Sequence, residues 1–337
     1  MIRLRIFGIG AFAFIALTVA GCGGSPDRPS TLPPGDPTTA PNAPTAFRGS
    51  GLEVSTEGLG SQEFAAAFVG ERITFNWNRV ERAEDYILEV GEGPVDSSVF
   101  TATVSGLTLD WNPTRSGNFS ARVRARNVQG VGQASPEVTV FSVEPRDYVE
   151  WLFLGTGPHG SGGCPSPGLL GGWRPGTAIR LVLAPDLPAQ TVQTTNNMAS
   201  EMGASTLNVV TAHTSLSSDL DPQPQPGDLT LSFFLIPPTG GIVGQFFIIE
   251  SGSDGYRRGR VLLVRGNDPT PHELGHALYG FCHHASAEIS RLTTMGAGGR
   301  IGFRLTEADR RSLQAVYAAG LRPGASRERF VQAGLIR

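Results

Sequence analysis

Lysine is absent from this chain of 337 residues, and all 27 of its basic residues are arginine. Charged residues make up only 17% of the sequence, and 27 basic against 30 acidic side chains leave a formal net charge of −3. Such a balance creates no general attraction for polyanions, so we expect no nucleic-acid partner. Three cysteines are too few for a disulfide scaffold. The chain is 39% hydrophobic, which suffices for packed cores, and its length indicates two domains of ordinary size.

An apolar run lies at the N-terminus, where the two arginines of Met1–Arg5 precede Ile6–Ala20. The run is shorter than the roughly 20 residues that a membrane-spanning helix needs, so residues 1–21 are expected to be a signal peptide. It ends in Val19-Ala20-Gly21-Cys22, which resembles a bacterial lipobox. The resemblance implies a lipid on Cys22 that anchors the protein in the bacterial cell envelope, at the outer membrane or cell surface. An ordinary secretory signal with an incidental cysteine is the alternative.

Residues 22–45 are dominated by Pro, Thr, Ser and Gly, and they contain almost nothing to bury. This composition predicts an extended tether between the lipid anchor and the globular part. At about 3.1 Å per residue, the tether could reach up to roughly 70 Å from the membrane.

Residues 46–143 carry short stretches of alternating apolar and polar residues separated by turn residues. About a hundred residues of this pattern predict an antiparallel β-sandwich. Trp77, Tyr86 and the run 117–140 are similar to the strands of a fibronectin type III domain, although Phe119 stands where that family has its corner tyrosine. The resemblance implies a spacer or adhesion module whose aromatic residues belong to the core.

From residue 144 to residue 337 the pattern changes to a mixture of strands and helices. The expected strands are 179–183, 207–211, 229–235, 243–249 and 261–264, and the expected helices are 187–202, 270–280 and 306–319 with Thr306 as N-cap. This order predicts an α+β domain with a mixed sheet, an active-site helix and a C-terminal helix. The whole chain is therefore expected to be multidomain, an all-β sandwich followed by an α+β domain.

The sequence HELGHALYGFCHH at residues 272–284 contains four of the six histidines. His272 and His276 are four residues apart, so on a helix both imidazoles point to the same side and can reach one metal ion. Glu273 projects beside that metal, where a bound water would lie. The segment therefore predicts a metal site on a helix, with a carboxylate next to it.

Further features accompany this motif, namely Gly280, the histidines that follow it, and Met295. Together they resemble the metzincin zinc proteases, whose motif HExxHxxGxxH is followed by a methionine turn. Residues 303–320 are similar to the last helix of the matrixin branch of these proteases. The resemblance spans about residues 176–320 and implies a matrixin-like zinc metalloprotease domain at 144–337. In that family the methionine is not a ligand but a hydrophobic floor under the metal site.

The spacing leaves the third ligand open, because the family's glycine and third histidine would fall where this chain has Tyr279 and Cys282. Gly280 and His283 keep the family's glycine–histidine separation, one residue later. Gly280 can adopt the left-handed conformation that ends a helix and turns the chain back. We therefore expect His283 to be the third ligand. The alternatives are His284, Cys282 and Glu288.

A zinc ion held by three neutral imidazoles keeps one position open and lowers the pKa of a bound water toward about 7. The resemblance implies that Glu273 is the catalytic base, taking the proton of that water and passing it to the leaving amine. The peptide is expected to lie antiparallel to an edge strand near residues 242–249. We expect a monomeric, lipid-anchored, extracytoplasmic zinc endopeptidase that acts on protein or peptide substrates. Alternatives are an inactive surface binding or adhesion lipoprotein, and a structural lipoprotein without metal.

Two cysteines remain if Cys22 is lipidated, and in an oxidising compartment Cys164 and Cys282 most simply form a disulfide. In the alternative, Cys164 caps the zinc as a latency switch, as the cysteine of a matrixin propeptide does. Asp219 and Asp221 lie in one loop and are candidates for binding Ca²⁺, an ordinary solvated loop being the alternative.

Overall fold

The structure is a computed structural model of the chain. It describes residues 39–55, 62–93, 97–158, 160, 163–166, 168–236, 238–239, 242–266, 270–284, 286–296 and 304–337. The chain divides into two units, residues 1–39 and residues 40–337, and every element named below belongs to the second. The expected signal peptide, the lipidation site Cys22 and most of the expected tether lie outside the described residues.

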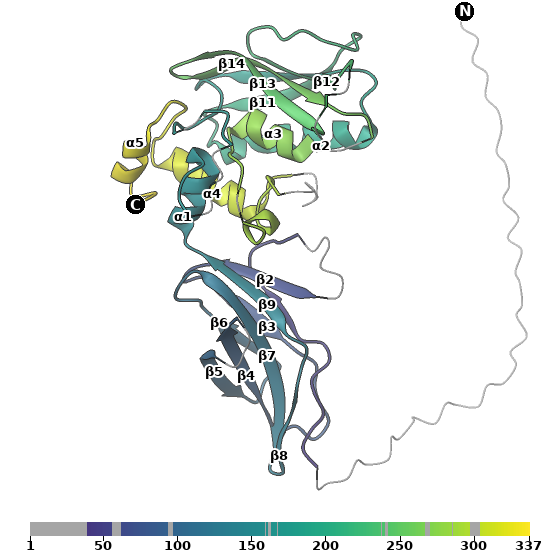
Figure 1. Cartoon of the computed structure of the whole chain (residues 1–337), viewed down its shortest axis with the longest axis vertical. Coiled ribbons are helices and arrows are strands. Elements are labelled where there is room, and N and C mark those ends of the chain that lie inside the picture. The colour runs from purple at the N-terminus through teal and green to yellow at the C-terminus, as the bar shows by residue number, and fades with distance from the viewer. Residues whose placement is uncertain are drawn as a thin grey trace, which may run out of the picture. The chain divides into compact units, whose positions relative to one another are not determined.

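The first part of the second unit is a sandwich of two β-sheets (Figure 1). One sheet has the order β1-β3-β6, and the other has the order β2-β9-β7-β4-β5 with β8 paired to β7. The strands are β1 (Arg48–Ser50), β2 (Glu63–Phe68), β3 (Ile73–Asn76), β4 (Asp85–Glu92), β5 (Ser98–Val104), β6 (Thr108–Trp111), β7 (Gly117–Asn127), β8 (Gly130–Ala134) and β9 (Val138–Val143). The β-sandwich predicted for residues 46–143 is therefore present.

Strand β7 shows why the alternating pattern was a reliable guide. Its apolar residues from Phe119 to Ala125 are buried, and the arginines between them face outward, where Arg122 pairs with Glu89. The prediction of a wholly antiparallel sandwich is wrong at one pair, because β2 runs parallel to β9. These two strands are distant in sequence and are not joined by a hairpin, so nothing in the connection forces them to be antiparallel.

The second part contains a five-stranded mixed sheet with the order β11-β10-β12-β14-β13. The strands are β10 (Ala178–Leu183), β11 (Thr211–Leu216), β12 (Asp228–Phe233), β13 (Gly244–Gly252) and β14 (Gly255–Leu263). The first four in spatial order run parallel, and β13 pairs antiparallel with β14 at one edge. A hairpin turn joins β13 to β14, which explains why this pair alone is antiparallel.

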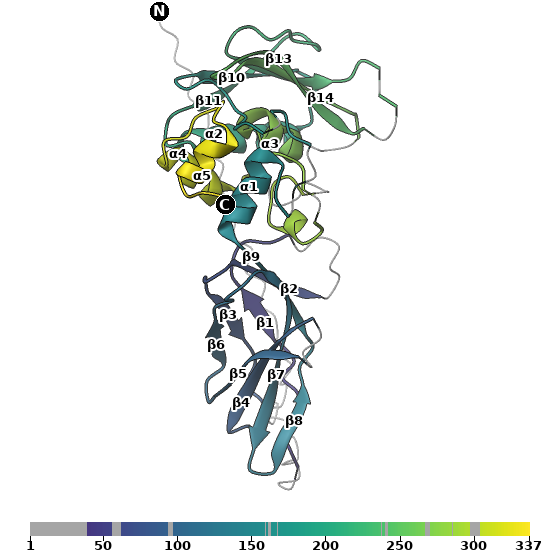
Figure 2. The ribbon, with the colours of Figure 1, turned by 60° about the vertical axis from the view of Figure 1, so that its left-hand side comes forward.

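Five α-helices accompany this sheet in the described part of the chain, and Figures 1 and 2 show α2 and α3 beneath one of its faces. They are α1 (Pro145–Leu154), α2 (Ala189–Ser205), α3 (Thr270–Tyr279), α4 (Glu307–Ala318) and α5 (Arg327–Gln332), with a 3₁₀ turn η1 at Ile289–Arg291. The helices expected near 187–202, 270–280 and 306–319 are present, and the Thr306 side chain accepts a hydrogen bond from the backbone N–H of Asp309 as an N-cap does. Helices α1 and α5 were not predicted.

One expected strand is misplaced, because β11 begins at Thr211 where a strand was expected to end. Leu207 and Asn208 adopt left-handed backbone conformations, with φ of 53° and 61°, which turn the chain after α2 before the strand can begin. Strand β14 begins at Gly255, earlier than the expected strand 261–264. Its first half was not predicted, because that half is rich in arginine and lacks an apolar run.

Sandwich and α+β part share a hydrophobic core. Phe64, Phe68 and Val143 of the sandwich belong to the same buried cluster as Tyr148 and Trp151 of α1. The rings of Phe68 and Tyr148 meet edge to face with their centroids 5.6 Å apart. Helix α1 follows β9 with only Glu144 between them, so the core passes from one part into the other.

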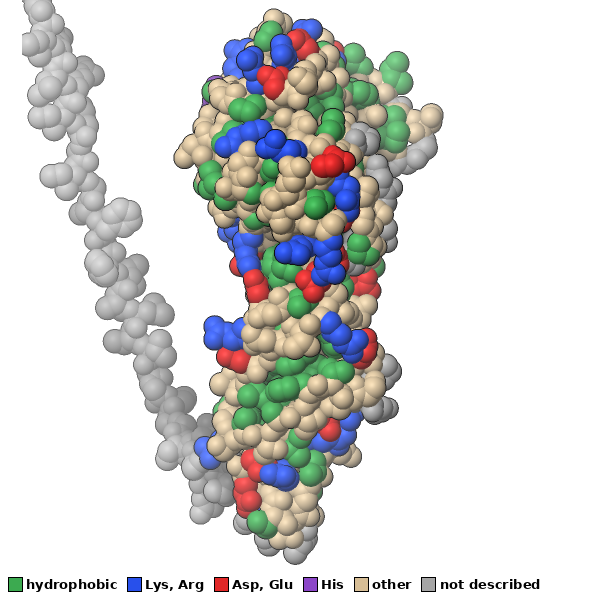
Figure 3. All heavy atoms as spheres, turned by 90° about the vertical axis from the view of Figure 1, so that its left-hand side faces the viewer, with side chains coloured by type: hydrophobic (Ala, Val, Ile, Leu, Met, Phe, Trp, Pro, Cys, Tyr) green, Lys and Arg blue, Asp and Glu red, His purple; other side chains and the backbone are tan. Residues whose placement is uncertain are grey.

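Charges of both signs are interspersed on the surface. On the face drawn in Figure 3, arginine and acidic side chains lie next to one another, in keeping with the nearly balanced composition. Within the described part of the chain, no helix has the length and hydropathy needed to cross a membrane.

Candidate metal centre

Helix α3 carries two of the histidines on one side. Pro271 occupies its first turn, where a missing N–H costs nothing and the fixed φ favours the helix. The rings of His272 and His276 lie with their centroids 4.8 Å apart, as expected for side chains separated by one helical turn. The four-residue spacing thus brings the two imidazoles together on one side of the helix.

Gly280 ends the helix and turns the chain back toward the histidines. Its φ of 71° is in the left-handed region. The backbone N–H of Gly280 donates to the carbonyl of His276 at 3.1 Å, which is the bond that closes a helix ending in a left-handed glycine. A side chain at position 280 would also collide with the backbone of Gly171, since a Cβ there would lie 2.4 Å from its carbonyl carbon. Only glycine fits this turn.

The reversal brings His283 to the other two histidines. Its Nε2 atom lies 3.2 Å from Nε2 of His272 and 2.8 Å from Nε2 of His276. The three ligand atoms all lie within 4.8 Å of one another. Two nitrogens bound to one zinc ion at about 2.0–2.1 Å in tetrahedral geometry are about 3.4 Å apart. The donor set therefore fits a single metal ion.

The outward-facing nitrogens of the helix histidines have backbone partners. The Nδ1 atom of His276 lies 2.6 Å from the carbonyl oxygen of Phe281, and that of His272 lies 3.2 Å from the carbonyl oxygen of Met295. An N–H at Nδ1 donates to such a carbonyl and leaves the lone pair on Nε2. This is the arrangement that orients imidazole ligands in metal sites.

Burial keeps the helix histidines neutral. Together with a smaller effect of neighbouring histidines, burial lowers the pKa of His272 to about 4 and that of His276 to about 3. Burial also raises the pKa of Glu273 to about 7, against a hydrogen bond from the backbone of Phe246 that favours the carboxylate. The site thus combines neutral nitrogen donors with a carboxyl group poised to exchange a proton near neutral pH.

Met295 packs directly beneath helix α3. It is fully buried, and a Cβ on Gly275 would lie 2.4 Å from its sulfur, so the methionine fills the place of a side chain there. The carbonyl oxygen of Met295 also faces His272, as described above. The structure therefore puts Met295 under the cluster without making it a donor.

A buried carboxylate fixes the turn that leads to Met295. Asp309, on α4, accepts hydrogen bonds from the hydroxyl of Tyr148 at 2.8 Å, from the hydroxyl of Thr293 at 3.0 Å and from the backbone N–H of Thr294 at 2.6 Å. Burial raises the pKa of Asp309, and these donors oppose that rise. Helices α1 and α4 are thereby joined to the methionine turn.

The other candidates for the third ligand lie elsewhere. His284 turns its Nε2 toward the carbonyl of Met295 at 3.1 Å and its ring against Trp151. Glu288 accepts hydrogen bonds from Ser286 at 2.7 Å and from Asn118 of the sandwich at 3.3 Å. The structure brings His283 to the pair on α3, and it does not bring these residues there.

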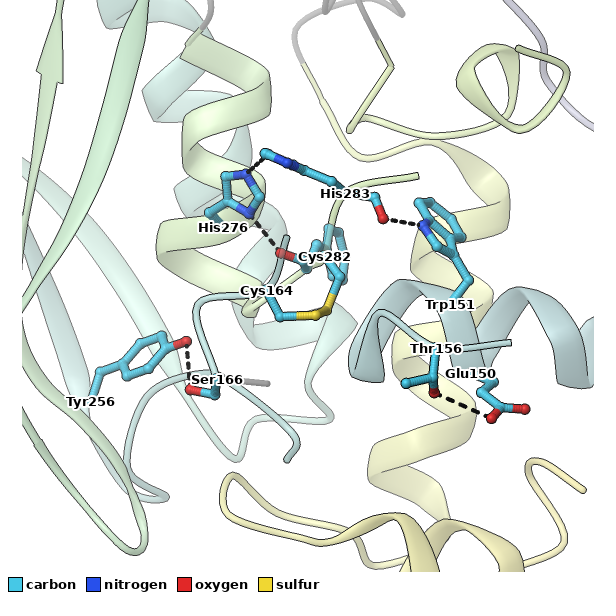
Figure 4. The surroundings of a disulfide bond; sticks show 10 residues. Glu150, Trp151, Thr156, Cys164, Ser166, Tyr256, His276, Cys282 and His283 are labelled. Carbon is cyan, nitrogen blue, oxygen red and sulfur yellow. Dashed lines mark hydrogen bonds between the residues drawn. A yellow bond between two sulfur atoms is a disulfide. The ribbon is translucent and has the colours of Figure 1, made fainter. Parts of the chain in front are cut away.

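Cys164 and Cys282 are joined in a disulfide, which Figure 4 shows between the end of α3 and helix α1. Cys282 is buried and directly precedes His283. A sulfur in this bond is not free to bind a metal, so neither the latency switch through Cys164 nor ligation by Cys282 occurs in this structure.

The remaining site candidates are separate from the cluster. Asp221 pairs with Arg260 and accepts a hydrogen bond from Gln223. Its carboxylate therefore binds these side chains of the protein and does not face a site for Ca²⁺. Among the described residues, the three histidines form the group that could hold a metal ion. His213 lies on β11, away from this group, and His159 is outside the described residues.

Sequence reasoning missed two residues that contact the site. Trp151 donates its indole N–H to the carbonyl of His283 at 2.6 Å, and the carbonyl of Gly163 accepts from the backbone N–H of His283 at 2.9 Å. Neither residue lies in a motif, and both precede the sheet. No spacing rule connects them to the histidines, because the contact depends on how α1 packs.

The similarities to solved structures cover about a third of the chain. No protein-family model matches it, and no curated protein matches it. Among solved structures it is similar to FN3tt, with 15% identity over 31% of this chain and 96% of that chain and a TM-score of 0.24. An Fn3-like protein from Clostridium thermocellum is 16% identical over 31% of this chain and 97% of its own, with a TM-score of 0.20. The FN5 domain of Drosophila Lar is 17% identical over 30% of this chain and 96% of its own, with a TM-score of 0.23.

Proposed function

We propose that the chain is a zinc-dependent endopeptidase of the metzincin type, similar to the matrixin branch, that hydrolyses protein or peptide substrates. The observation that carries the proposal is the meeting of three imidazole Nε2 atoms from His272, His276 and His283. Glu273 lies on the same helix, next to the first of them. Three neutral nitrogen donors with a carboxyl group beside them are the usual residues of a hydrolytic zinc centre.

Zinc suits this donor set because imidazole is one of its preferred ligands and three protein ligands leave a position for water or substrate. When bound, zinc supplies a Lewis acid that lowers the pKa of water and polarises a carbonyl group. His272, His276 and His283 would hold the ion through Nε2. Met295 would support the site from below without contributing a donor.

Glu273 performs the proton transfers in this proposal. Its carboxylate accepts a proton from the water that attacks the peptide carbonyl, and the resulting carboxylic acid gives that proton to the leaving amide nitrogen. A pKa of about 7 suits both steps, because the group can be either protonated or ionised near neutral pH. The hydrogen bond from the backbone of Phe246, on β13, holds the carboxyl group beside the edge strand.

Strand β13 is the proposed platform for the substrate. It is the last strand in the sheet order, and among the described strands it pairs only with β14. A peptide can add to such an edge through its own backbone N–H and C=O groups. The link from Phe246 on this strand to Glu273 would bring a peptide on β13 close to the catalytic carboxylate.

The test compares the wild type with Glu273→Ala, using a mixed peptide library and metal analysis. We expect both proteins to hold about one zinc ion per chain, and the variant to lose cleavage by at least the order of 10²–10⁴-fold that a general base contributes. Chelation should abolish wild-type cleavage, and added zinc should restore it. A zinc-loaded wild type that cleaves no peptide would favour the alternative, an inactive surface binding or adhesion lipoprotein.

Two single substitutions test the ligand assignment. His283→Ala should lose zinc, since it removes a donor. His284→Ala should retain zinc, since the His284 ring faces the Met295 carbonyl. The opposite pair of results would refute the assignment of His283.

We also propose that the protein is lipid-anchored through Cys22 in the bacterial cell envelope. The support is the lipobox-like sequence Val19-Ala20-Gly21-Cys22 after an apolar run. Metabolic labelling with a radioactive fatty acid should label the wild type and not Cys22→Ser. Equal labelling of the two proteins would refute the anchor.

A further inference from the structure

The position of the third histidine is not set by a helix or a strand. His272 and His276 are held by the regular hydrogen bonds of α3, whereas His283 lies in the segment after Gly280, outside any helix or strand. A ligand in such a segment is positioned only by the contacts that its backbone and ring make with other parts of the chain.

Helix α1 supplies the first set of these contacts. The indole N–H of Trp151 donates to the carbonyl oxygen of His283 at 2.6 Å (Figure 4). The carbonyl of Leu152 accepts from the backbone N–H of Cys282 at 2.8 Å. Trp151 and Leu152 are both fully buried, so close packing within the core fixes the α1 side of these two bonds.

Residues 163–164 supply the second set. The carbonyl of Gly163 accepts from the backbone N–H of His283 at 2.9 Å, and Cys164 is bonded to Cys282. The backbone of Gly163 also lies against the imidazole, since a Cβ on Gly163 would be 2.4 Å from Nδ1 of His283. The His283 ring is therefore confined between Gly163 and the histidines on α3.

We propose that Trp151 is a positioning residue for the metal centre, and that it works together with Gly163 to hold His283 at the metal. This inference rests on the proposed metal-binding function, and it adds that helix α1 belongs to the outer shell of the site. Loss of either contact lets the 281–284 segment move and weakens the binding of zinc. Substitution of a residue that hydrogen-bonds a metal ligand typically weakens metal binding by about 10- to 100-fold.

The main experiment measures the zinc Kd of the full chain by competition with a chromophoric chelator. Trp151→Phe removes the indole N–H and keeps an aromatic ring. The matched control is Trp173→Phe, because Trp173 is equally buried and donates its indole N–H to the carbonyl of Ala277 at 2.8 Å. That carbonyl belongs to α3, whose conformation is maintained by its own backbone hydrogen bonds. We expect the Kd to rise about 10- to 100-fold in Trp151→Phe and to stay within about twofold of wild type in Trp173→Phe.

A second variant keeps the proposal testable if Trp151→Phe does not fold. Gly163→Ala places a methyl group against the His283 ring at a partly exposed position, with Gly106→Ala as control because a Cβ there meets nothing closer than 3.9 Å. We expect weaker zinc binding and an altered visible spectrum of the Co²⁺-loaded chain for Gly163→Ala alone. Wild-type Kd values in Gly163→Ala and in any folded Trp151→Phe would overturn this inference and leave the proposed peptidase intact. A wild type that binds no zinc would overturn both.

Discussion

Removing the disulfide between Cys164 and Cys282 should destabilise the protein strongly. The perturbation is the double substitution Cys164→Ala and Cys282→Ala in a Cys22→Ser background, which leaves no other cysteine. Alanine is chosen because Cys282 is fully buried, and a serine hydroxyl there would need a hydrogen-bond partner.

The expected magnitude follows from the length of chain that the bond closes. The two cysteines are 118 residues apart, and between them lie β10 to β14 together with α2 and α3. Closing a loop of that length lowers the entropy of the unfolded chain by about 16 cal/mol/K, which corresponds to about 5 kcal/mol at 25 °C. Native disulfides typically contribute about 2–5 kcal/mol, so we expect a loss in that range.

Urea unfolding of three samples measures the effect. The oxidised Cys22→Ser protein should unfold at a clearly higher urea concentration than the same protein after reduction, and the double variant should match the reduced sample. Reductant should not alter the double variant, which serves as the control. Coincident unfolding curves for the oxidised and reduced protein would refute the reasoning.

Other predictions concern stability, and each is tested by chemical unfolding. Phe281→Ala should cost about 3–5 kcal/mol, because this fully buried ring leaves a cavity, and a loss below about 1 kcal/mol would contradict that packing. Burial raises the pKa of Asp309 above 3.8, so its protonated form favours the folded state at low pH, and this contribution is lost as the pH rises through the folded-state pKa. The unfolding free energy of wild type should therefore fall relative to Asp309→Asn as the pH rises from about 3.8, and a pH-independent difference would refute the assignment. Arg311→Ala should cost less than about 1 kcal/mol, because the side chains of Arg311 and its partner Glu71 keep 40% and 37% of their surfaces accessible to solvent.

Periodicity in the sequence predicted the sandwich and most of the second part, but it missed helices α1 and α5. Helix α5 has only six residues, which is too short to show a helical period. In helix α1 the residues from Tyr148 to Leu154 are all buried. A helix without a polar face has no 3.6-residue pattern, so it could not be told from a strand or a linker. The N-cap of α4 was predictable because Thr306 and Asp309 interact within one turn.

The candidate site likewise has a part that was predictable from local sequence and a part that depends on distant contacts. His272 and His276 were predictable as a pair because one helix fixes both, and Gly280 was recognisable as the reversal. The Gly280 reversal favoured His283 as the third ligand but left His284, Cys282 and Glu288 open as alternatives, since the outcome depends on the contacts of the segment after the helix. Those contacts come from Trp151 and Gly163, more than a hundred residues earlier in the chain, as the distances to His283 show.

The hydrophobic core that runs from β2 and β9 into α1 limits how such a protein could be rearranged. Phe68 packs on Tyr148, and Tyr148 donates to Asp309, which holds the turn before Met295. A chimaera that joined a foreign sandwich to residue 144 would have to reproduce the ring at position 68 to preserve this chain of contacts. Exchange of either part alone would break the contacts between Phe68, Tyr148 and Asp309, so we expect the two parts to be inherited together.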